Sequence, residues 1–397
     1  IIAANGRYGV YRTSGTVTSL YNDVWGHMIS NYYNCAAGEG DFSRNPNLAG
    51  GSDYHPRSRA GSWHDGAWTA DDDHSPCIDA GDPADDVGGE LAENGGRINV
   101  GAYGGTPLAS KSIGYVPAAA PRYVRPSTDS WTPAWPYTNW TTAADSIQTA
   151  LNGADGQPVY VKAGVYWITN GPLLMASASL LGGYLGEGTP GDRAVFPAQV
   201  CTLDANLKNR VIECRAAAEG TVIDGFTIRR GSINAGGSGL YVVGGTLTVR
   251  GNRLVDQVSG YGSGYGAAMA IQSAAVAISN NLIAANTCGN ANAGAGVIHT
   301  TSGMTLVNNT ICNNKSGIKD GGILQTGGHS VIRNNIVAGN SLYGIRLAGG
   351  TADLSYNDVW GNGVSNYVNC APGTGDISRN PFFVDEIDYR LQSPVGS

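Results

Sequence analysis

The chain contains 397 residues, of which 14% are charged, and it carries a formal net charge of −7. Its lysine and arginine residues form no cluster, which argues against nucleic acid and against anionic membrane surfaces as partners. The hydrophobic share of 42% excludes a disordered chain, and no apolar run reaches the ~18 residues of a membrane span, so membrane insertion is not expected. Glycine makes up 59 residues, about twice its usual share, which favours an all-β protein with many tight turns.

The first 46 residues recur near the other end of the chain. Residues 336–381 match residues 1–46 at 26 of 46 positions without a gap, at a separation of 335 residues. Two copies this far apart indicate a tandem array of repeats, and we expect the chain to open near the end of one repeat and to close near the end of the next. The YNDVWG segment, with Asp23 and Asp358, occurs in both copies and is interpreted as a structural turn rather than as an active site.

Residues 1–110 are expected to form the closing coils of one repeat and a terminator. The stretch from Asp53 to Thr106 is dense in Gly, Pro and Asp and shows little periodicity, so we interpret it as an ordered terminating segment. Residues 111–139 contain an extended linker rich in Ala, Pro and Ser and the start of a cap. Residues 140–397 then hold a capping helix and the coils of the next repeat, without its terminator.

A single helix is predicted in the segment TTAADSIQTALNG, residues 141–153. Thr142 and Asp145 have the spacing of a capping box, and Gly153 is a typical helix end. Because this helix is short and amphipathic and precedes a long β region, we expect it to cover the open hydrophobic end of the first coil.

From Gln157 onward the sequence predicts only short strands. Five successive runs end in asparagine, at spacings of 29, 28, 26 and 22 residues: Asn252, Asn281, Asn309, Asn335 and Asn357. This period is typical of a β-solenoid with parallel sheets, in which the asparagine side chains stack from coil to coil. Equivalent residues then lie ~4.8 Å apart in columns. We expect one interior column of Ile283, Ile311 and Val337 beside another of Ala284, Cys312 and Ala338.

Seven cysteines occur without a CxxC pair or the Cys/His spacing of a zinc site. We favour buried free thiols, since cysteine packs as a small hydrophobic residue. The alternative, for an exported protein, is a disulfide between Cys201 and Cys214 or between Cys35 and Cys77.

Five segments together resemble a known architecture: YTNWTTAADSIQTAL, VIDGFTIRRG, YNDVWGN, SPCIDAGDP and GGRINVGAYGGT. They are similar to the right-handed parallel β-helix repeat proteins, of pectate-lyase-like fold, in large secreted and surface-attached bacterial polypeptides. The resemblance covers nearly the whole chain except the linker. It implies an extracellular or cell-surface location, and it leaves the activity open because this fold hosts lyases, hydrolases, epimerases and non-enzymatic adhesins.

The resemblance also implies where lyase chemistry would have to lie. Pectate lyases take a proton α to a uronate carboxylate with a basic side chain, while Ca²⁺ neutralises that carboxylate. The richest group of suitable side chains is Lys315, Lys319 and Asp320, with Arg229 and Arg230 a few coils away. These residues do not reproduce a lyase signature, so we favour a solvated face over the wall of a sugar groove.

Acidic residues form a candidate calcium site, because Ca²⁺ prefers several oxygen ligands. The candidate ligands are Asp82, Asp85, Asp86 and Glu90. Neither an EF-hand loop nor a calcium-binding nonapeptide surrounds them, and structural turns are favoured; no other cofactor is expected. Asp224 in VIDGFTI is likewise interpreted as a turn residue.

We therefore expect a non-enzymatic extracellular or cell-surface module of a tandem-repeat protein, structural or adhesive, with polysaccharide as a contact. The alternative is a polysaccharide-active enzyme, a uronate lyase before a hydrolase or an epimerase. Because the two copies of the repeated stretch are interchangeable in sequence, the N-terminal coils are also expected to stack on a β-helix end in another molecule. This gives head-to-tail self-association through open strand edges.

Overall fold

The computed structural model describes residues 1–64, 66–91, 94–112, 120–134, 137–154, 156–260, 265–289, 297–317, 321–385 and 389–392. The chain divides into two compact units. The N-terminal unit contains residues 1–124 and 131–159, and the C-terminal unit contains residues 125–130 and 160–397. Both consist mainly of short β-strands.

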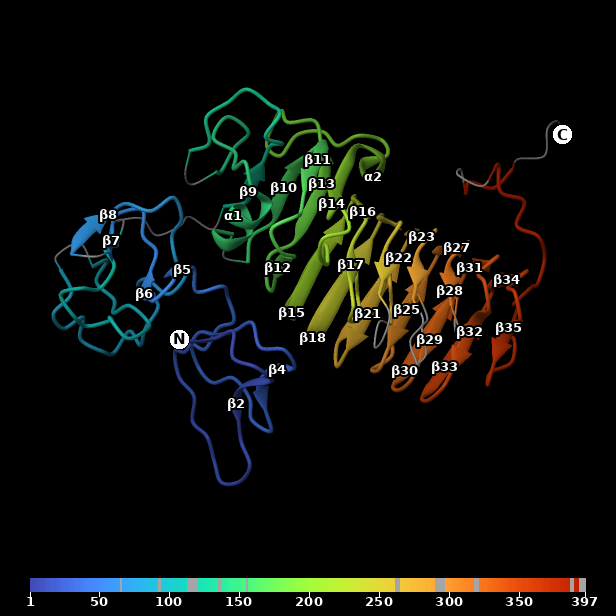
Figure 1. Cartoon of the computed structure of the whole chain (residues 1–397), viewed down its shortest axis with the longest axis horizontal. Helices are drawn as coiled ribbons and strands as arrows, with labels where there is room; N and C mark the ends of the chain where they lie inside the picture. The colour runs from blue at the N-terminus through green and yellow to red at the C-terminus, as the bar shows by residue number, and fades with distance from the viewer. Residues whose placement is uncertain are drawn as a thin grey trace. The chain divides into compact units, whose positions relative to one another are not determined.

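The C-terminal unit is a parallel β-helix, whose stacked strands run from green to red in Figure 1. Successive coils each contribute one strand to a sheet that holds eight strands among the described residues, and its neighbours all pair in parallel. This eight-stranded sheet consists of β11 (Gly164–Trp167), β14 (Cys201–Asp204), β16 (Thr227–Arg229), β19 (Arg253–Val255), β23 (Leu282–Ala284), β27 (Thr310–Cys312), β31 (Ile336–Ala338) and β34 (Asp358–Trp360).

A larger sheet forms two further faces of the same coils. β18 (Leu240–Arg250) runs around the corner between these faces, since its first half pairs with β21 (Met269–Gln272) and its second half with β22 (Ala275–Ser279). This sheet also contains β10 (Val159–Lys162), β12 (Leu173–Met175), β13 (Leu180–Tyr184), β15 (Ile212–Asp224), β25 (Ile298–Thr300), β26 (Thr305–Val307), β29 (Ile323–Gln325), β30 (His329–Arg333), β32 (Tyr343–Leu347), β33 (Thr351–Ser355) and β35 (Ser365–Val368).

A narrow third sheet completes the coils. Its strands in chain order are β17 (Ser232–Ile233), β20 (Val258–Ser259), β24 (Thr287–Cys288) and β28 (Lys315–Ser316). The short helix α2 (Pro197–Val200) precedes β14. The three sheets confirm the prediction of an all-β parallel solenoid.

The core of the β-helix is built from columns of equivalent residues. Ile283 pairs in register with Ile311, and Ile311 with Val337, and all three are fully buried. Burying a large aliphatic side chain contributes ~1.5–3 kcal/mol, and the stack repeats this contribution from coil to coil. The predicted small-residue column is also present and buried, with members Ala284, Cys312 and Ala338.

The predicted asparagine ladder lies at one corner of the coils. Asn281 accepts hydrogen bonds from the backbone N–H and the side-chain amide of Asn252, and it donates to the side-chain oxygen of Asn309 at 3.0 Å. The same contacts continue through Asn335 to Asn357, and all five side chains are buried. Each side-chain amide in the ladder therefore both donates and accepts hydrogen bonds, and buried polar groups are stable when their hydrogen bonds are made in this way.

The residue before each ladder position makes the turn. Asn280 and Asn308 have φ values of 56° and 58°, a conformation that asparagine tolerates better than most residues. This explains the paired asparagines in the sequence, because the first one turns the chain and the second one joins the ladder.

A second amide ladder follows the first at an interval of five residues. Asn314 donates to the side-chain oxygen of Asn340 at 2.9 Å, and Asn340 donates to that of Asn362 at 2.9 Å. The sequence pattern does not reveal this ladder, because asparagine is frequent throughout the chain and the shared spacing does not stand out. Its members in the described coils are Gln257, Asn286, Asn314, Asn340 and Asn362.

The N-terminal unit begins with a coil that matches the repeat. β1 (Ile2–Ala3) pairs with β3 (Val24–Trp25), and β2 (Tyr8–Tyr11) pairs with β4 (Ser30–Tyr33), both in parallel. The register is the one that β31 has with β34, and β32 with β35. The ladder also ends alike in both copies, on a carboxylate that only accepts hydrogen bonds: Asn22 donates to Asp41, and Asn357 to Asp376.

Two antiparallel hairpins follow this coil in the sequence. β5 (Leu48–Gly50) pairs with β6 (Asp53–Pro56), and β7 (Ser62–His64) pairs with β8 (Ala67–Thr69), while β9 (Arg122–Val124) follows further along the chain. In the C-terminal unit, Phe383 pairs antiparallel with Leu391. These positions are equivalent to those of Leu48 and Pro56, so the structural repeat extends into this first hairpin although the sequences differ there.

The helix α1 (Ile147–Asn152) is shorter than predicted. Its N-cap is Ser146, whose side chain accepts a backbone N–H of the first turn, and its C-cap is Gly153 as predicted. The prediction that Thr142 caps the helix was wrong, because the side-chain oxygen of Asn139 accepts the backbone N–H of Thr142 and holds that residue in a turn. The role of α1 as a cover for the first coil stays a prediction.

Candidate functional site

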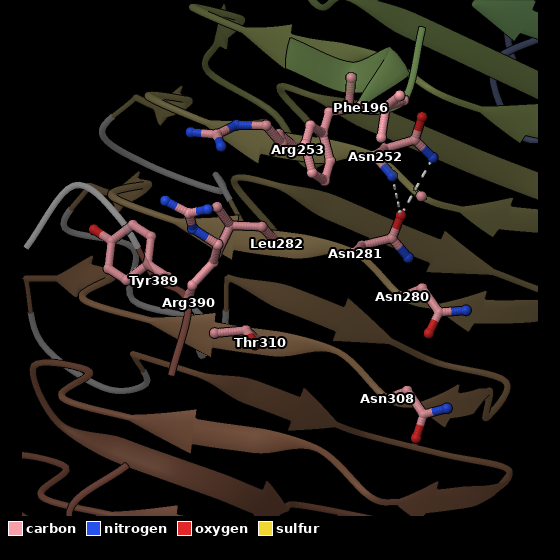
Figure 2. A pocket seen from close by; sticks show the side chains of 13 residues that line it. Phe196, Asn252, Arg253, Asn280, Asn281, Leu282, Asn308, Thr310, Tyr389 and Arg390 are labelled. Carbon is pink, nitrogen blue, oxygen red and sulfur yellow. Dashed lines mark hydrogen bonds between the residues drawn. The ribbon is translucent and has the colours of Figure 1, made fainter. Parts of the chain in front are cut away.

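A groove of about 410 Å³ lies on the surface of the C-terminal unit, across the eight-stranded sheet. Figure 2 shows the side chains along it. One side is lined by Val195, Phe196 and Ala198, from the segment that leads into α2. Tyr389 and Arg390, which follow the last coils, also line the groove, where Figure 2 shows them beside the strands.

The floor of the groove is a column of half-exposed residues. Arg253, Leu282 and Thr310 begin β19, β23 and β27 and are aligned by the strand register. They face outward because side chains alternate along a strand and the following residue of each strand is buried in the core. Successive members lie ~4.8 Å apart, so an extended ligand along the β-helix axis meets a new side chain at every coil.

The groove is positively charged and partly aromatic. Arg253 and Arg390 line it, and its described lining residues include neither Asp nor Glu. Arg253 forms no ion pair within the part of the chain that the structure describes. Phe196 is 58% exposed, and together with Tyr389 it offers an aromatic surface against which the apolar faces of sugars can pack.

Asparagine side chains add neutral hydrogen-bonding groups to the groove. Asn280 and Asn308 are exposed on its edge. Asn252 and Asn281 line it too, but their amides are engaged in the ladder. The described lining residues can therefore bind carboxylates and hydroxyls, and they contain no carboxylic acid paired with a base for proton transfer.

The predicted bases Arg229 and Arg230 are engaged with a buried carboxylate. Asp204 is fully buried and accepts from Nε of Arg229 at 2.7 Å and from Nη2 of Arg230 at 2.8 Å. Burial alone raises the pKa of Asp204, but the hydrogen bonds of Arg230, the Asn206 amide and Arg229 outweigh it and lower that pKa. The bond to Asp204 also raises the pKa of Arg230. A guanidinium held in its charged form is a poor proton acceptor, which favours a structural ion pair over a catalytic base.

Trp167 gives the eight-stranded sheet another exposed aromatic ring. It is 59% exposed, and the guanidinium carbon of Arg230 lies 5.8 Å from its ring centroid. An exposed tryptophan on β11 and a half-exposed arginine just after β16 therefore stand beside each other on the sheet that carries the groove.

The remaining lyase candidates lie elsewhere. Lys315 is exposed on β28 in the narrow third sheet. Three strand steps, or ~14 Å, separate its coil from that of Arg229, so the structure does not bring these two residues together. Lys319 and Asp320 lie outside the described residues. Asp224 pairs with Arg193 and Arg250, in keeping with a structural role at a turn.

The candidate calcium ligands do not converge on one point. Asp82 and Asp85 line a polar cavity of about 490 Å³ in the N-terminal unit, and Asp86 is exposed. Glu90 is buried, and its side chain accepts the backbone N–H groups of Asn99 and Gly105 at 2.8 and 2.9 Å. Among the described residues, no group of three His, Cys, Asp or Glu side chains is arranged to hold a metal ion. Calcium binding stays a prediction.

The seven cysteines are free thiols, and five of them are buried. Burial raises the pKa of Cys201 and of Cys214 to about 12. The structure therefore agrees with the interpretation of the cysteines as packing residues and contains neither of the alternative disulfides.

Residues 211–380 match the family model described as a right handed beta helix region. The matched stretch is less than half of the chain. The β-helix is therefore right-handed, as the resemblance implied. No curated protein and no solved structure matches the chain significantly. Within the described residues, no helix combines the length and the hydropathy that crossing a membrane requires.

The residues of the groove carry no motif that predicts them from the sequence. Its sides come from segments around Phe196 and Tyr389, which are far apart in the sequence, so their meeting depends on the stacking of all the coils between them. One local signal was present: Arg253 directly follows the ladder residue Asn252, and this position begins a strand on the outer face.

Proposed function

We propose that this chain is a non-enzymatic β-helix module of an extracellular or cell-surface polypeptide and that its groove binds an acidic polysaccharide. The observation that carries the proposal is the groove over the eight-stranded sheet, which Arg253 and Arg390 line without a carboxylate among its described residues. A uronate polymer carries a carboxylate on every sugar, and guanidinium groups bind carboxylates through paired hydrogen bonds.

The form of the groove supports an extended ligand. Its floor repeats at the spacing of the coils, and the sequence of charged, apolar and hydroxyl groups along Arg253, Leu282 and Thr310 matches the mixed surface of a sugar chain. Binding without cleavage fits the described residues better than catalysis, because the described lining of the groove contains no carboxylic acid that could act with a base, and Arg229 and Arg230 are fixed on Asp204.

Binding to polygalacturonate and to a neutral glucan tests the proposal. Arg253→Ala should weaken polygalacturonate binding about tenfold or more, since a hydrogen bond to a charged group contributes ~1.5–3 kcal/mol. Arg333→Ala is the matched control, because Arg333 is exposed at the end of β30, on another sheet. Added salt should weaken binding by the unmodified chain more than binding by the Arg253→Ala variant.

Equal affinity for the neutral glucan, or an equal effect of both substitutions, would contradict the proposal. The rival function is a uronate lyase. It predicts that incubation with polygalacturonate produces unsaturated sugars with a new ultraviolet absorbance, and robust turnover in this assay would replace binding by catalysis as the function.

We also propose head-to-tail association of the β-helix ends. β1 is bonded to β3 on one side, whereas its counterpart β31 lies between β27 and β34. Among the described residues β3 is the one strand that pairs with β1, and the backbone groups on the other side of β1 are of the kind that pair elsewhere in the stack. Light scattering over a range of concentrations should show growing oligomers, and a constant monomer mass would contradict this association.

A further inference from the structure

Two hairpins of the N-terminal unit are joined by a cluster of titratable side chains, which we call the His64 cluster. It consists of Asp53 and His55 on β6, Ser62 and His64 on β7, and Asp71 just after β8. It belongs to the N-terminal unit, whereas the groove belongs to the C-terminal unit, and it plays no part in the proposed binding of polysaccharide.

The imidazole of His64 lies between two carboxylates, one on β6 of the other hairpin and one just after β8 of its own hairpin. Its Nδ1 is 3.0 Å from Oδ2 of Asp53, and its Nε2 is 3.2 Å from Oδ1 of Asp71. Nε2 is also 2.7 Å from Oγ of Ser62, which in turn donates to Oδ2 of Asp71 at 2.5 Å. His64 therefore links the β5–β6 hairpin to the β7–β8 hairpin.

Ser62, His64 and Asp53 are arranged in the order of a catalytic triad, but the environment excludes that role. Ser62 is fully buried, so a substrate cannot reach its hydroxyl. Its proton already goes to Asp71, and both nitrogens of His64 face oxygen atoms of carboxylates. A general base needs a free lone pair, whereas this arrangement asks both nitrogens of His64 to donate.

All contacts in the cluster are satisfied together only when His64 is an imidazolium. The protonated ring donates to Asp53 from Nδ1 and toward Asp71 and Ser62 from Nε2, which leaves the Ser62 hydroxyl free to donate to Asp71. A neutral ring with its proton on Nδ1 presents the lone pair of Nε2 to Asp71. The single proton of the Ser62 hydroxyl can then be donated either to Nε2 of His64 or to Asp71, but not to both. Loss of that proton therefore makes the contact between β7 and the segment just after β8 repulsive, while Nδ1 keeps its bond to Asp53.

The surroundings of the cluster add one more titratable link on each side. On the Asp53 side, Nδ1 of His55 lies 2.7 Å from Oδ1 of Asp53. Burial raises the pKa of Asp53, but the amide and imidazole of His55 and the imidazole of His64 outweigh burial and lower that pKa. His55 itself is buried and stacks on Tyr103.

On the Asp71 side, burial lowers the pKa of His74 to about 4, with a further contribution from Arg59 and opposition from Asp71. His74 is therefore neutral above pH ~5, and Arg59 lies within ion-pair range of Asp73.

We propose that the His64 cluster is a pH-sensitive lock that holds the β7–β8 hairpin closed when His64 is protonated and loosens this hairpin when His64 loses its proton. The lock is closed at mildly acidic pH and opens as the pH rises.

The tryptophan pair of the β7–β8 hairpin reports on the lock. Trp63 and Trp68 are cross-strand neighbours, with ring centroids 5.3 Å apart and an interplanar angle of 72°. Such a pair gives a coupled circular-dichroism signal, which Trp68→Phe removes and thereby identifies. Between pH 5.5 and 8.5 this signal should fall at least threefold in the unmodified chain.

Variants of the two histidines assign the response. His64→Gln should abolish the pH dependence and leave a weak signal throughout, whereas His55→Gln, the matched control on the same carboxylate, should keep the dependence. An Asp23→Asn background removes the titration of another buried group in the same unit. If His64→Gln prevents folding of the hairpin, Asp71→Asn serves in its place, and it should preserve the signal at pH 8.5 because the repulsive carboxylate is gone.

A constant signal in the unmodified chain would overturn the proposal. So would a response that His55→Gln abolishes and His64→Gln retains, or an Asp71→Asn profile identical to that of the unmodified chain.

Discussion

At the scale of single residues, the buried carboxyl of Asp23 makes the stability of the N-terminal unit depend on pH. Asp23 is fully buried, accepts the backbone N–H of Arg44 at 3.0 Å and lies 3.3 Å from the thiol of Cys77. Burial raises its pKa to about 7, against the opposing hydrogen bonds of Arg44 and Cys77. The folded carboxyl thus keeps a proton that the unfolded one loses above pH ~4, so folding should be most stable at low pH and lose stability as the pH rises to about 7.

Asp23→Asn should remove this dependence, since an amide keeps the shape without the charge. Between pH 5 and pH 8, the free energy of unfolding should fall in the unmodified unit by on the order of 2–4 kcal/mol more than it falls in the variant. Urea unfolding of both proteins at the two pH values measures the difference. Asp358→Asn is the matched control: burial raises the pKa of Asp358 as well, but that residue is only partly buried, so the same sign with a smaller size is expected. An unchanged pH profile in Asp23→Asn would show that other groups carry the dependence.

At the scale of elements, the amide ladder should determine how cooperatively the coils stack. Asn309 donates to Ile278, Val307 and Asn335 and accepts from Asn281. Asn309→Ala leaves these buried groups without partners and should destabilise the C-terminal unit by about 2–5 kcal/mol. Asn308→Gly is the neighbouring control, because glycine adopts the positive φ of this exposed turn position without strain. Denaturant unfolding compares the two variants, and similar midpoints would mean that water replaces the ladder contacts.

The same elements show what a sequence can predict. The first ladder and the Ile283 column were predictable because stacking repeats one local environment many times, so that each coil confirms its neighbour. The start of α1 was not predictable in this way, because both Thr142 and Ser146 are suitable N-cap residues. The side chain of Asn139 accepts the backbone N–H of Thr142, and Ser146 caps the helix. The groove was beyond sequence reasoning for a different reason: Arg253 and Arg390 meet only through the summed geometry of the intervening coils.

At the scale of the whole molecule, the two copies of the closing coil differ at one ladder position. Asn362 donates to the side-chain oxygen of Asn366 and to the carbonyl of Val337, both at 2.9 Å. Its counterpart in the N-terminal unit is His27, whose ring nitrogens lie 3.0 and 3.1 Å from the carbonyls of Asn5 and Ile2. The counterpart of Asn366 is Asn31, and its buried side-chain oxygen has no hydrogen-bond partner. The repeat therefore keeps its fold in both copies while one copy loses a ladder bond.

Exchanging these two residues tests whether the copies obey the same rules. In His27→Asn, the amide should donate to Asn31 and to the carbonyl of Ile2, as Asn362 does to the equivalent groups in the other copy. Satisfying the buried oxygen of Asn31 should stabilise the N-terminal unit by about 1 kcal/mol. The reciprocal Asn362→His should cost about 1–3 kcal/mol in the C-terminal unit, since it leaves Asn366 in the state that Asn31 has now. Urea unfolding of both variants gives the two values, and opposite signs are required. If both substitutions destabilise, the histidine contacts to Asn5 and Ile2 outweigh the ladder, and the two coils are equivalent in shape without being equivalent in energy.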